Sequence, residues 1–283
     1  MARMIERLEE LTGNYDVILC DVWGVVHNGV RPFPQSVDAL RRARERGATV
    51  VLITNSPRRR QDVEDQLAVL GVGDDCYDFV VTSGDVTRDL IRDNAQRIFH
   101  IGPDRDLTLF DGLDVELCEE FEASTVVCTG LYDDEAETPD DYAELLQRLR
   151  QRNLPFICAN PDIVVERGER LIWCAGAIAR DYAQLGGRTL IAGKPHHPIY
   201  EAALKAARDI SGGDVDTSRV LAIGDGVLTD VKGASDNGLD VLFVSAGIHA
   251  AEYGAAHEPD PQRLAAFLDK HGYGPVAVIP RLA

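Results

Sequence analysis

The segment Val220-Leu221-Ala222-Ile223-Gly224-Asp225-Gly226 joins an apolar, strand-like run to an acidic side chain between two glycines. Other parts of the chain share this design, in which an apolar run ends in a polar, chemically active side chain. They are Val17-Ile18-Leu19-Cys20-Asp21, Val50-Val51-Leu52-Ile53-Thr54-Asn55-Ser56 and Leu190-Ile191-Ala192-Gly193-Lys194-Pro195. Helix-like stretches separate these runs, and such an alternation predicts an α/β fold with a mostly parallel sheet between helices.

The pattern of apolar residues gives the expected elements. Strands are predicted at 17–21, 49–54, 79–82, 98–101, 125–129, 155–159, 189–192, 220–223, 241–244 and, as an edge strand, 275–279. Helices are predicted at 35–46, 58–70, 85–94, 139–151, 173–184, 198–210, 230–237 and 261–270. The motif strands cluster at both ends of this series, and the stretch between them is too long for a loop. We therefore expect a Rossmann-like, doubly wound core formed by 1–92 and 190–283, with a smaller α/β cap domain inserted at 93–189.

The composition limits the partners. The chain has 283 residues and a formal net charge of −18. A surface this acidic repels nucleic acid and anionic membranes, so neither is an expected partner. No apolar run approaches the roughly 20 residues that span a bilayer. The N-terminus lacks the apolar core of a secretory signal, and the cysteines are typical of buried thiols in a reducing compartment, so a cytoplasmic location is expected.

Ligands bind at the carboxyl ends of the strands in sheets of this kind. A carboxylate such as that of Asp21 can attack phosphorus there and also bind a hard cation. Asp225 is a natural Mg²⁺ ligand, and Asp230 could bind the ion directly or through water, or orient Lys194. Lys194 can neutralise both the nucleophile and a phosphoryl group. The alternative is that these acids only cap turns at strand ends.

The stretch after the second motif has the residues of a helix start. Ser56 fits the N-cap position and Pro57 the first helical position. Backbone N–H groups at such a terminus, with the Thr54 hydroxyl, can cradle phosphate oxygens. The run Arg58-Arg59-Arg60 could steer an anionic substrate, but a solvated helix face is the favoured interpretation.

These four segments, in this order, resemble the haloacid dehalogenase-like (HAD) hydrolase superfamily. The position of the insert resembles its class with a type-2 cap, and further details resemble the NagD-like group of class IIA. Those details are Thr54-Asn55, Thr82-Ser83, Ala159-Asn160-Pro161-Asp162 and Gly193-Lys194-Pro195. The resemblance covers residues 15–250, nearly the whole chain.

The resemblance implies a role for each matching residue. Asp21 would become phosphorylated, and Mg²⁺ would be held by Asp21, the backbone carbonyl of Trp23, and Asp225. Asn160 and Asp162 would lie near the leaving group, although Asn-Pro-Asp is also ordinary turn chemistry. The implied set is Asp21, Thr54 and Lys194 for catalysis, Asn55, Ser56, Asn160 and Asp162 for substrate binding, and Asp21, Trp23, Asp225 and Asp230 for the metal.

Trp23 departs from the family pattern. Phosphatases of the family carry a second Asp here, which protonates the leaving oxygen, and losing such a group costs about 10²–10⁴ in rate. Dehalogenase relatives also carry an aromatic residue here, but they lack this acidic fourth motif. Another residue could replace the acid, the substrate could have a good leaving group such as an acyl phosphate, or the protein could bind a phosphorylated ligand without turnover. Candidates for the replacement are His27, His196 and His197.

We therefore expect a Mg²⁺-dependent phosphohydrolase that acts on a small phosphorylated metabolite, such as a sugar phosphate, through a phospho-Asp21 intermediate. One alternative is a catalytically weak or inactive scaffold that binds a phosphorylated ligand. The other is a dehalogenase-like enzyme that hydrolyses a bond at carbon. The resemblance is compatible with a homodimer, because caps of this type often mediate dimerisation in relatives, but the sequence does not give the oligomeric state. No motif within 93–189 specifies the substrate.

Overall fold

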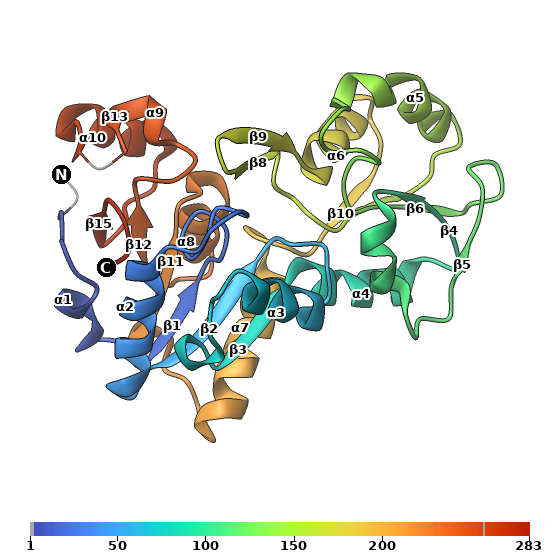
Figure 1. Cartoon of the computed structure of the whole chain (residues 1–283). Coiled ribbons are helices and arrows are strands. Elements are labelled where there is room, and N and C mark those ends of the chain that lie inside the picture. Colours follow the sequence, from blue (N-terminus) through green and yellow to red (C-terminus); the bar gives the residue numbers. More distant parts are fainter. Residues whose placement is uncertain (1–2, 257) are drawn as a thin grey trace.

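The computed structural model describes residues 3–256 and 258–283, whose strands form two parallel sheets in separate lobes (Figure 1). The larger sheet has the strand order β15 (Ala277–Ile279), β12 (Asp240–Val244), β11 (Val220–Gly224), β1 (Val17–Cys20), β2 (Thr49–Thr54) and β3 (Phe79–Thr82). The second sheet has the order β10 (Thr189–Ile191), β7 (Phe156–Cys158), β6 (Thr125–Cys128), β4 (Arg97–Ile101) and β5 (Glu116–Leu117). Antiparallel hairpins are formed by β8 (Val164–Arg167) with β9 (Arg170–Trp173), and by β13 (Gly254–Ala255) with β14 (Glu258–Pro259).

Helices cover both faces of the larger sheet. One face packs against α1 (Glu9–Thr12), α2 (Pro34–Glu45) and α3 (Arg60–Val69), and the other against α7 (His197–Ser211), α8 (Lys232–Asp236), α9 (Ala250–Tyr253) and α10 (Pro261–His271). In β1, Ile18 and Cys20 enter the first core and Val17 and Leu19 the second, so both faces of this strand are buried. The predicted doubly wound α/β fold, with β15 at the sheet edge, is confirmed.

The second sheet is covered in a similar way. Its cores include residues of α5 (Ala143–Gln151) and α6 (Ala175–Gln184) on one face, and of α4 (Ser83–Asn94) on the other. Within the described residues, no helix combines the length and the apolar character that crossing a bilayer requires.

The predicted boundaries at 92/93 and 189/190 fall inside α4 and β10 respectively. β10 pairs with β7, with Ile191 opposite Cys158, so the strand before Lys194 belongs to the second sheet and not to the core sheet. The division into a core and an inserted cap stays a prediction, which we place between α4 and Gly193.

Two local predictions were wrong. α3 begins at Arg60, so Ser56 is not its N-cap; the first N–H of this helix, from Arg60, donates instead to Asp85 Oδ2 of α4 at 2.9 Å. The helix expected from Trp173 begins at Ala175, because residues 164–173 form the β8–β9 hairpin. Its turn contains Gly168, which has φ +66°. On each side of this glycine come two charged residues and then an apolar run, which is a hairpin signal that was missed in the sequence.

Gly84 lets α4 touch the turn that follows β2. Its N–H donates to the Ser56 carbonyl at 3.0 Å, and a Cβ here would lie 2.5 Å from the Arg58 carbonyl oxygen. We expect Gly84→Ala to lower the free energy of unfolding by about 1–3 kcal/mol, measured by urea denaturation, because the backbone must shift. The matched control is Gly213→Ala, since nothing lies within 4 Å of a Cβ at that position. Equal losses in both variants would contradict this contact argument.

Candidate active site

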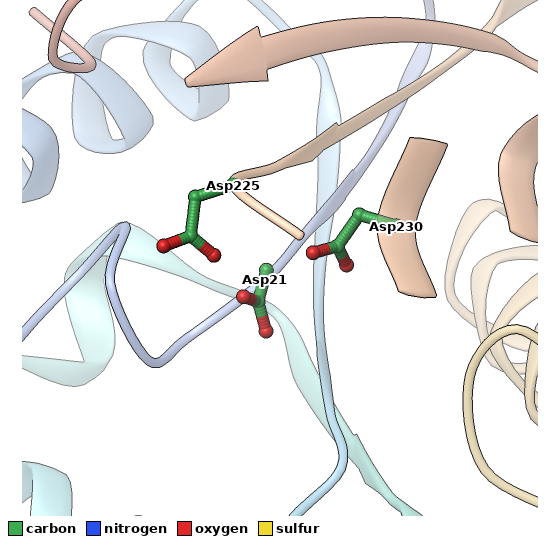
Figure 2. A group of neighbouring side chains, drawn as sticks. All are labelled: Asp21, Asp225 and Asp230. Atoms are coloured by element: carbon green, nitrogen blue, oxygen red, sulfur yellow. The ribbon is translucent and has the colours of Figure 1, made fainter. Parts of the chain in front are cut away.

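Three buried carboxylates, from Asp21, Asp225 and Asp230, converge beyond the carboxyl ends of β1 and β11 (Figure 2). One oxygen of each lies within 4.8 Å of the others. Asp21 and Asp225 follow neighbouring strands, in which Cys20 is opposite Ile223, and so the parallel register alone brings them together.

Lys194 is the cation at the centre of this group. Its Nζ donates to Asp21 Oδ1 at 2.6 Å and to Asp230 Oδ1 at 2.7 Å, and the residue is only 2% exposed. Burial by itself would lower the pKa of Lys194, but the charges of Asp21 and Asp230 raise it well above its usual value. The second oxygen of Asp230 accepts from the Gly226 N–H at 3.0 Å, so Asp230 is oriented to hold Lys194.

The carboxylates are nevertheless short of positive charge. Burial raises the pKa of Asp21 well above its usual value, and the neighbouring Asp230 raises it further. Burial, followed by Asp230, raises the pKa of Asp225 to about 7, although Asp225 Oδ2 accepts from the Ile248 N–H at 3.0 Å. The site thus contains one ammonium group and three carboxyl groups. A divalent cation would balance the excess negative charge of these carboxyl groups.

The backbone around Asp225 is shaped to leave its oxygens free of other side chains. A Cβ at Gly24 would lie 2.8 Å from Asp225 Cγ, and one at Gly247 would lie 2.5 Å from the same atom. Carboxylate oxygens are the ligands that Mg²⁺ prefers. The residues present therefore fit this ion, which Asp21 and Asp225 could hold.

Asn55 ties three parts of the chain together. Its Oδ1 accepts from the Lys194 N–H at 2.8 Å, and its Nδ2 donates to Asp162 Oδ1 at 2.8 Å. The neighbouring Thr54 ends β2, and its Oγ1 accepts from the Ser56 N–H at 3.2 Å. Asn55 thus joins the end of β2 to the Lys194 loop and to the segment before the β8–β9 hairpin.

Two adjoining cavities surround this centre. The first, called here the catalytic cavity, has a volume of about 330 Å³ and is lined by Asp21, Lys194 and Asp225 among others. The second has a volume of about 300 Å³ and is lined by Ser56, Arg58 and Asn160 among others. The residues that line both are Trp23, Thr54, Asp162 and Val165. Asn160 also forms the expected turn, because its Oδ1 accepts from the Asp162 N–H at 3.1 Å.

Trp23 contacts the second lobe. Its indole Nε1 donates to the carbonyl oxygen of Glu166 in β8. Its ring packs edge-on against His27, with 4.9 Å between the ring centroids. A Cβ at Gly29 would lie 2.5 Å from the indole, so a glycine is needed beside it. The side chain that replaces the expected acid is therefore a contact between the lobes and has no acidic proton to give.

The candidate histidines, His27, His196 and His197, lie outside the described lining of the two cavities. Burial lowers the pKa of His27 to about 4, and its Nδ1 accepts from the Gly29 N–H at 2.9 Å, so the ring is neutral near pH 7. His249, which the sequence analysis did not select, does line the catalytic cavity, and burial lowers its pKa.

Comparison with known proteins agrees with this geometry. Family models for a haloacid dehalogenase-like hydrolase and a HAD-like hydrolase match residues 18–116 and 191–269. A haloacid dehalogenase-like hydrolase from Brucella suis 1330 is 63% identical, with a TM-score of 0.90, over 99% of this chain and 100% of that chain. The chain therefore belongs to the haloacid dehalogenase-like hydrolase family, as the resemblance predicted.

More distant relatives define the group within that family. The chain is 24% identical to 5'-nucleotidase YutF of Bacillus subtilis, over 84% of this chain and 90% of that protein. It is 23% identical to ribonucleotide monophosphatase NagD of Escherichia coli, over 83% of this chain and 89% of that protein. The predicted resemblance to the NagD-like group is thereby confirmed.

Lys194→Met tests the charge balance of the site. Without the ammonium group, Asp21 and Asp230 stay buried without a cationic partner, and removing one member of a buried ion pair costs about 3–5 kcal/mol. The loss should be largest near pH 8 and should shrink as the pH falls. The reason is that the pKa of Asp21 is raised in the folded protein, so the folded variant takes up a proton there at a higher pH than the unfolded chain does. This proton uptake stabilises the folded variant as the pH falls. Urea denaturation from pH 5 to pH 8, without divalent ions, measures this, and a loss that grows toward pH 5 would contradict it.

Trp23→Phe tests the contact between the lobes. The substitution keeps an aromatic ring but removes the donor to the Glu166 carbonyl, which is worth about 0.5–1.5 kcal/mol. We expect faster hydrogen exchange at the amides of 164–173 in the variant. The amides of β6 and β7, which lie in the same lobe, are the internal control and should be unchanged. Unchanged exchange in the hairpin would show that the indole does not hold it.

Proposed function

We propose that this protein is a Mg²⁺-dependent phosphohydrolase that acts on a small phosphorylated metabolite. The observation that carries the proposal is Lys194, whose ammonium group bridges Asp21 and Asp230 at 2.6 and 2.7 Å beside Asp225. A nucleophilic carboxylate, a fixed cation and a set of oxygen ligands at one sheet edge suit phosphoryl transfer. The curated relatives YutF and NagD are named as a nucleotidase and a nucleotide phosphatase, which supports this chemistry.

The proposed reaction has two steps. Lys194 donates a hydrogen bond to Asp21 Oδ1, so the other carboxylate oxygen, Oδ2, attacks phosphorus. Lys194 and the Thr54 hydroxyl hold the phosphoryl oxygens during this step. The bond from phosphorus to the leaving oxygen breaks, and the phosphoryl group is carried on Asp21. Water then hydrolyses phospho-Asp21 and restores the carboxylate. Bound Mg²⁺, held by Asp21 and Asp225 with the Trp23 carbonyl as the proposed third ligand, would supply positive charge for the phosphoryl oxygens.

The leaving oxygen has no acidic side chain at the Trp23 position. We therefore propose that the enzyme favours substrates whose leaving group departs without a proton, such as acyl or aryl phosphates. In this proposal the residues from 93 to about 192 act as a cap over the site. The Asn55 to Asp162 and Trp23 to Glu166 hydrogen bonds support this, because both link the proposed core to the proposed cap.

The second candidate is a protein that binds a phosphorylated ligand without turning it over. The observation that favours it is again Trp23, whose indole donates to the Glu166 carbonyl at the position where the resemblance leads us to expect an acid.

Phosphate release decides between these candidates. Acetyl phosphate, an aryl phosphate and alkyl phosphates are incubated with the protein, with Mg²⁺ or with EDTA. We expect Mg²⁺-dependent release that is fastest for acetyl phosphate and that falls to background in Asp21→Asn. The control is Asp111→Asn, because that carboxylate is exposed and lies 3.8 Å from Arg59. No release from any compound, by folded protein that binds Mg²⁺, would support the binding protein instead.

A further inference from the structure

Arg58 is a partly buried guanidinium on the wall of the second cavity. Its Nη2 donates to Gln66 Oε1 at 2.6 Å, a neutral partner. Among the described residues, no carboxylate oxygen lies within 4.0 Å of its nitrogens. The sequence analysis favoured a solvated helix face for this run of arginines, and for Arg58 that interpretation was wrong, because α3 begins only at Arg60.

The two neighbouring arginines behave differently. Arg59 lies 3.8 Å from Asp111 and its side chain is 40% exposed, whereas Arg60 lies 3.5 Å from Glu64 and stacks on the Phe79 ring. Both therefore have partners on the protein itself. Arg58 is the member of the run that faces the second cavity without an acidic partner of its own.

Two further guanidinium groups, those of Arg105 and Arg167, line the same cavity. Arg105 and Arg167 both contact the same carboxylate, Asp134, at 2.6 and 2.7 Å. Asp134 thus holds both groups in place, and Glu135 also lies 3.7 Å from Arg167. Burial lowers the pKa of Arg58, the charge of Asp106 raises it, and repulsion by Arg105 and Arg167 lowers it, so these positive charges act on one another as well as on Asp106.

Other acids at the cavity also act on these charges. Asp106 and Asp162 also line it, but burial raises the pKa of both. Asp162 is already engaged by the Asn55 amide. The protein has a net charge of −18, so most of its surface is negative. The group of arginines at this cavity is an exception to that overall charge.

The position of the cavity connects it to the proposed reaction. Thr54 and Ser56, after β2, line one side, and Thr129 and Asn160, after β6 and β7, line the other. The carboxyl edges of both parallel sheets therefore face the same space, which is where sheets of this kind bind ligands. A phosphoryl group held at Thr54 would place the rest of the substrate beside Arg58.

We infer that the substrate is a phosphate ester or anhydride with a second anionic group, a carboxylate or another phosphate, which Arg58, Arg105 and Arg167 bind. The inference rests on the proposed function, because it takes the phosphoryl group to lie at Asp21 and Thr54. Guanidinium groups pair with such oxyanions through two parallel hydrogen bonds. The leaving group would thus be recognised by its charge, at the far end of the substrate from the transferred phosphoryl group.

Matched ligands and variants test this. The probes are 3-phosphoglycerate and glycerol 3-phosphate. The first carries a carboxylate where the second carries a hydroxymethyl group. Calorimetry with Mg²⁺ on the Asp21→Asn protein gives dissociation constants without turnover. We expect tighter binding of 3-phosphoglycerate. Adding Arg58→Gln should weaken that binding roughly 10- to 100-fold, as for loss of a charged hydrogen bond, and should change glycerol 3-phosphate binding less than about twofold.

The controls separate a local contact from general charge. Arg59→Gln removes the same charge from the neighbouring exposed residue and should leave both constants unchanged. Arg58→Lys, which keeps the charge but loses the planar fork, should give an intermediate loss. The inference is overturned if the two probes bind equally, if Arg58→Gln weakens both alike, or if Arg59→Gln has the same effect. Wild-type protein that releases no phosphate would refute the proposed function alone, because these constants do not depend on turnover.

Discussion

The structure depends on one buried ionic contact, the ammonium group of Lys194 between Asp21 and Asp230. Three chain segments that are distant in the sequence provide these groups, and all three side chains are nearly inaccessible to solvent. A buried charge is tolerated only with a close partner, so each segment must keep its position for the others to remain stable. The same requirement brings the carboxylates of Asp21, Asp225 and Asp230 and the ammonium group of Lys194 close to one another.

Much of this could be predicted from the sequence. Parallel strands gather their carboxyl ends at one edge, so Asp21, Thr54 and Asp225 were expected together from the apolar runs that precede them. The fold and its edge strand were predicted from the pattern of apolar runs, the family was predicted from the resemblance of the four motifs, and all three are confirmed. The residue roles stay predictions, although the proximity of Asp21, Lys194, Asp225 and Asp230 is what those roles require.

What the sequence did not predict depends on contacts between the two lobes. The β8–β9 hairpin was missed because residues 160–172 were assigned to no strand or helix, and the contact from Trp23 to Glu166 was missed with it. The helix start was misplaced because Asp85, distant along the chain, accepts from the N–H of Arg60. Arg58 could not be told from Arg59 and Arg60, since three adjacent arginines differ only in what surrounds them after folding.

The pairing of β10 with β7 has a mechanical consequence. Only Ala192 and Gly193 lie between the last residue of β10 and Lys194, so this lysine is tethered to a strand of the second sheet while its partners belong to the first. A rotation of one lobe against the other would pull directly on the ammonium group. The position of the Lys194 charge therefore depends on the angle between the lobes. A second lobe exchanged for that of another protein would have to keep this two-residue connection to Lys194 as well as its own surface.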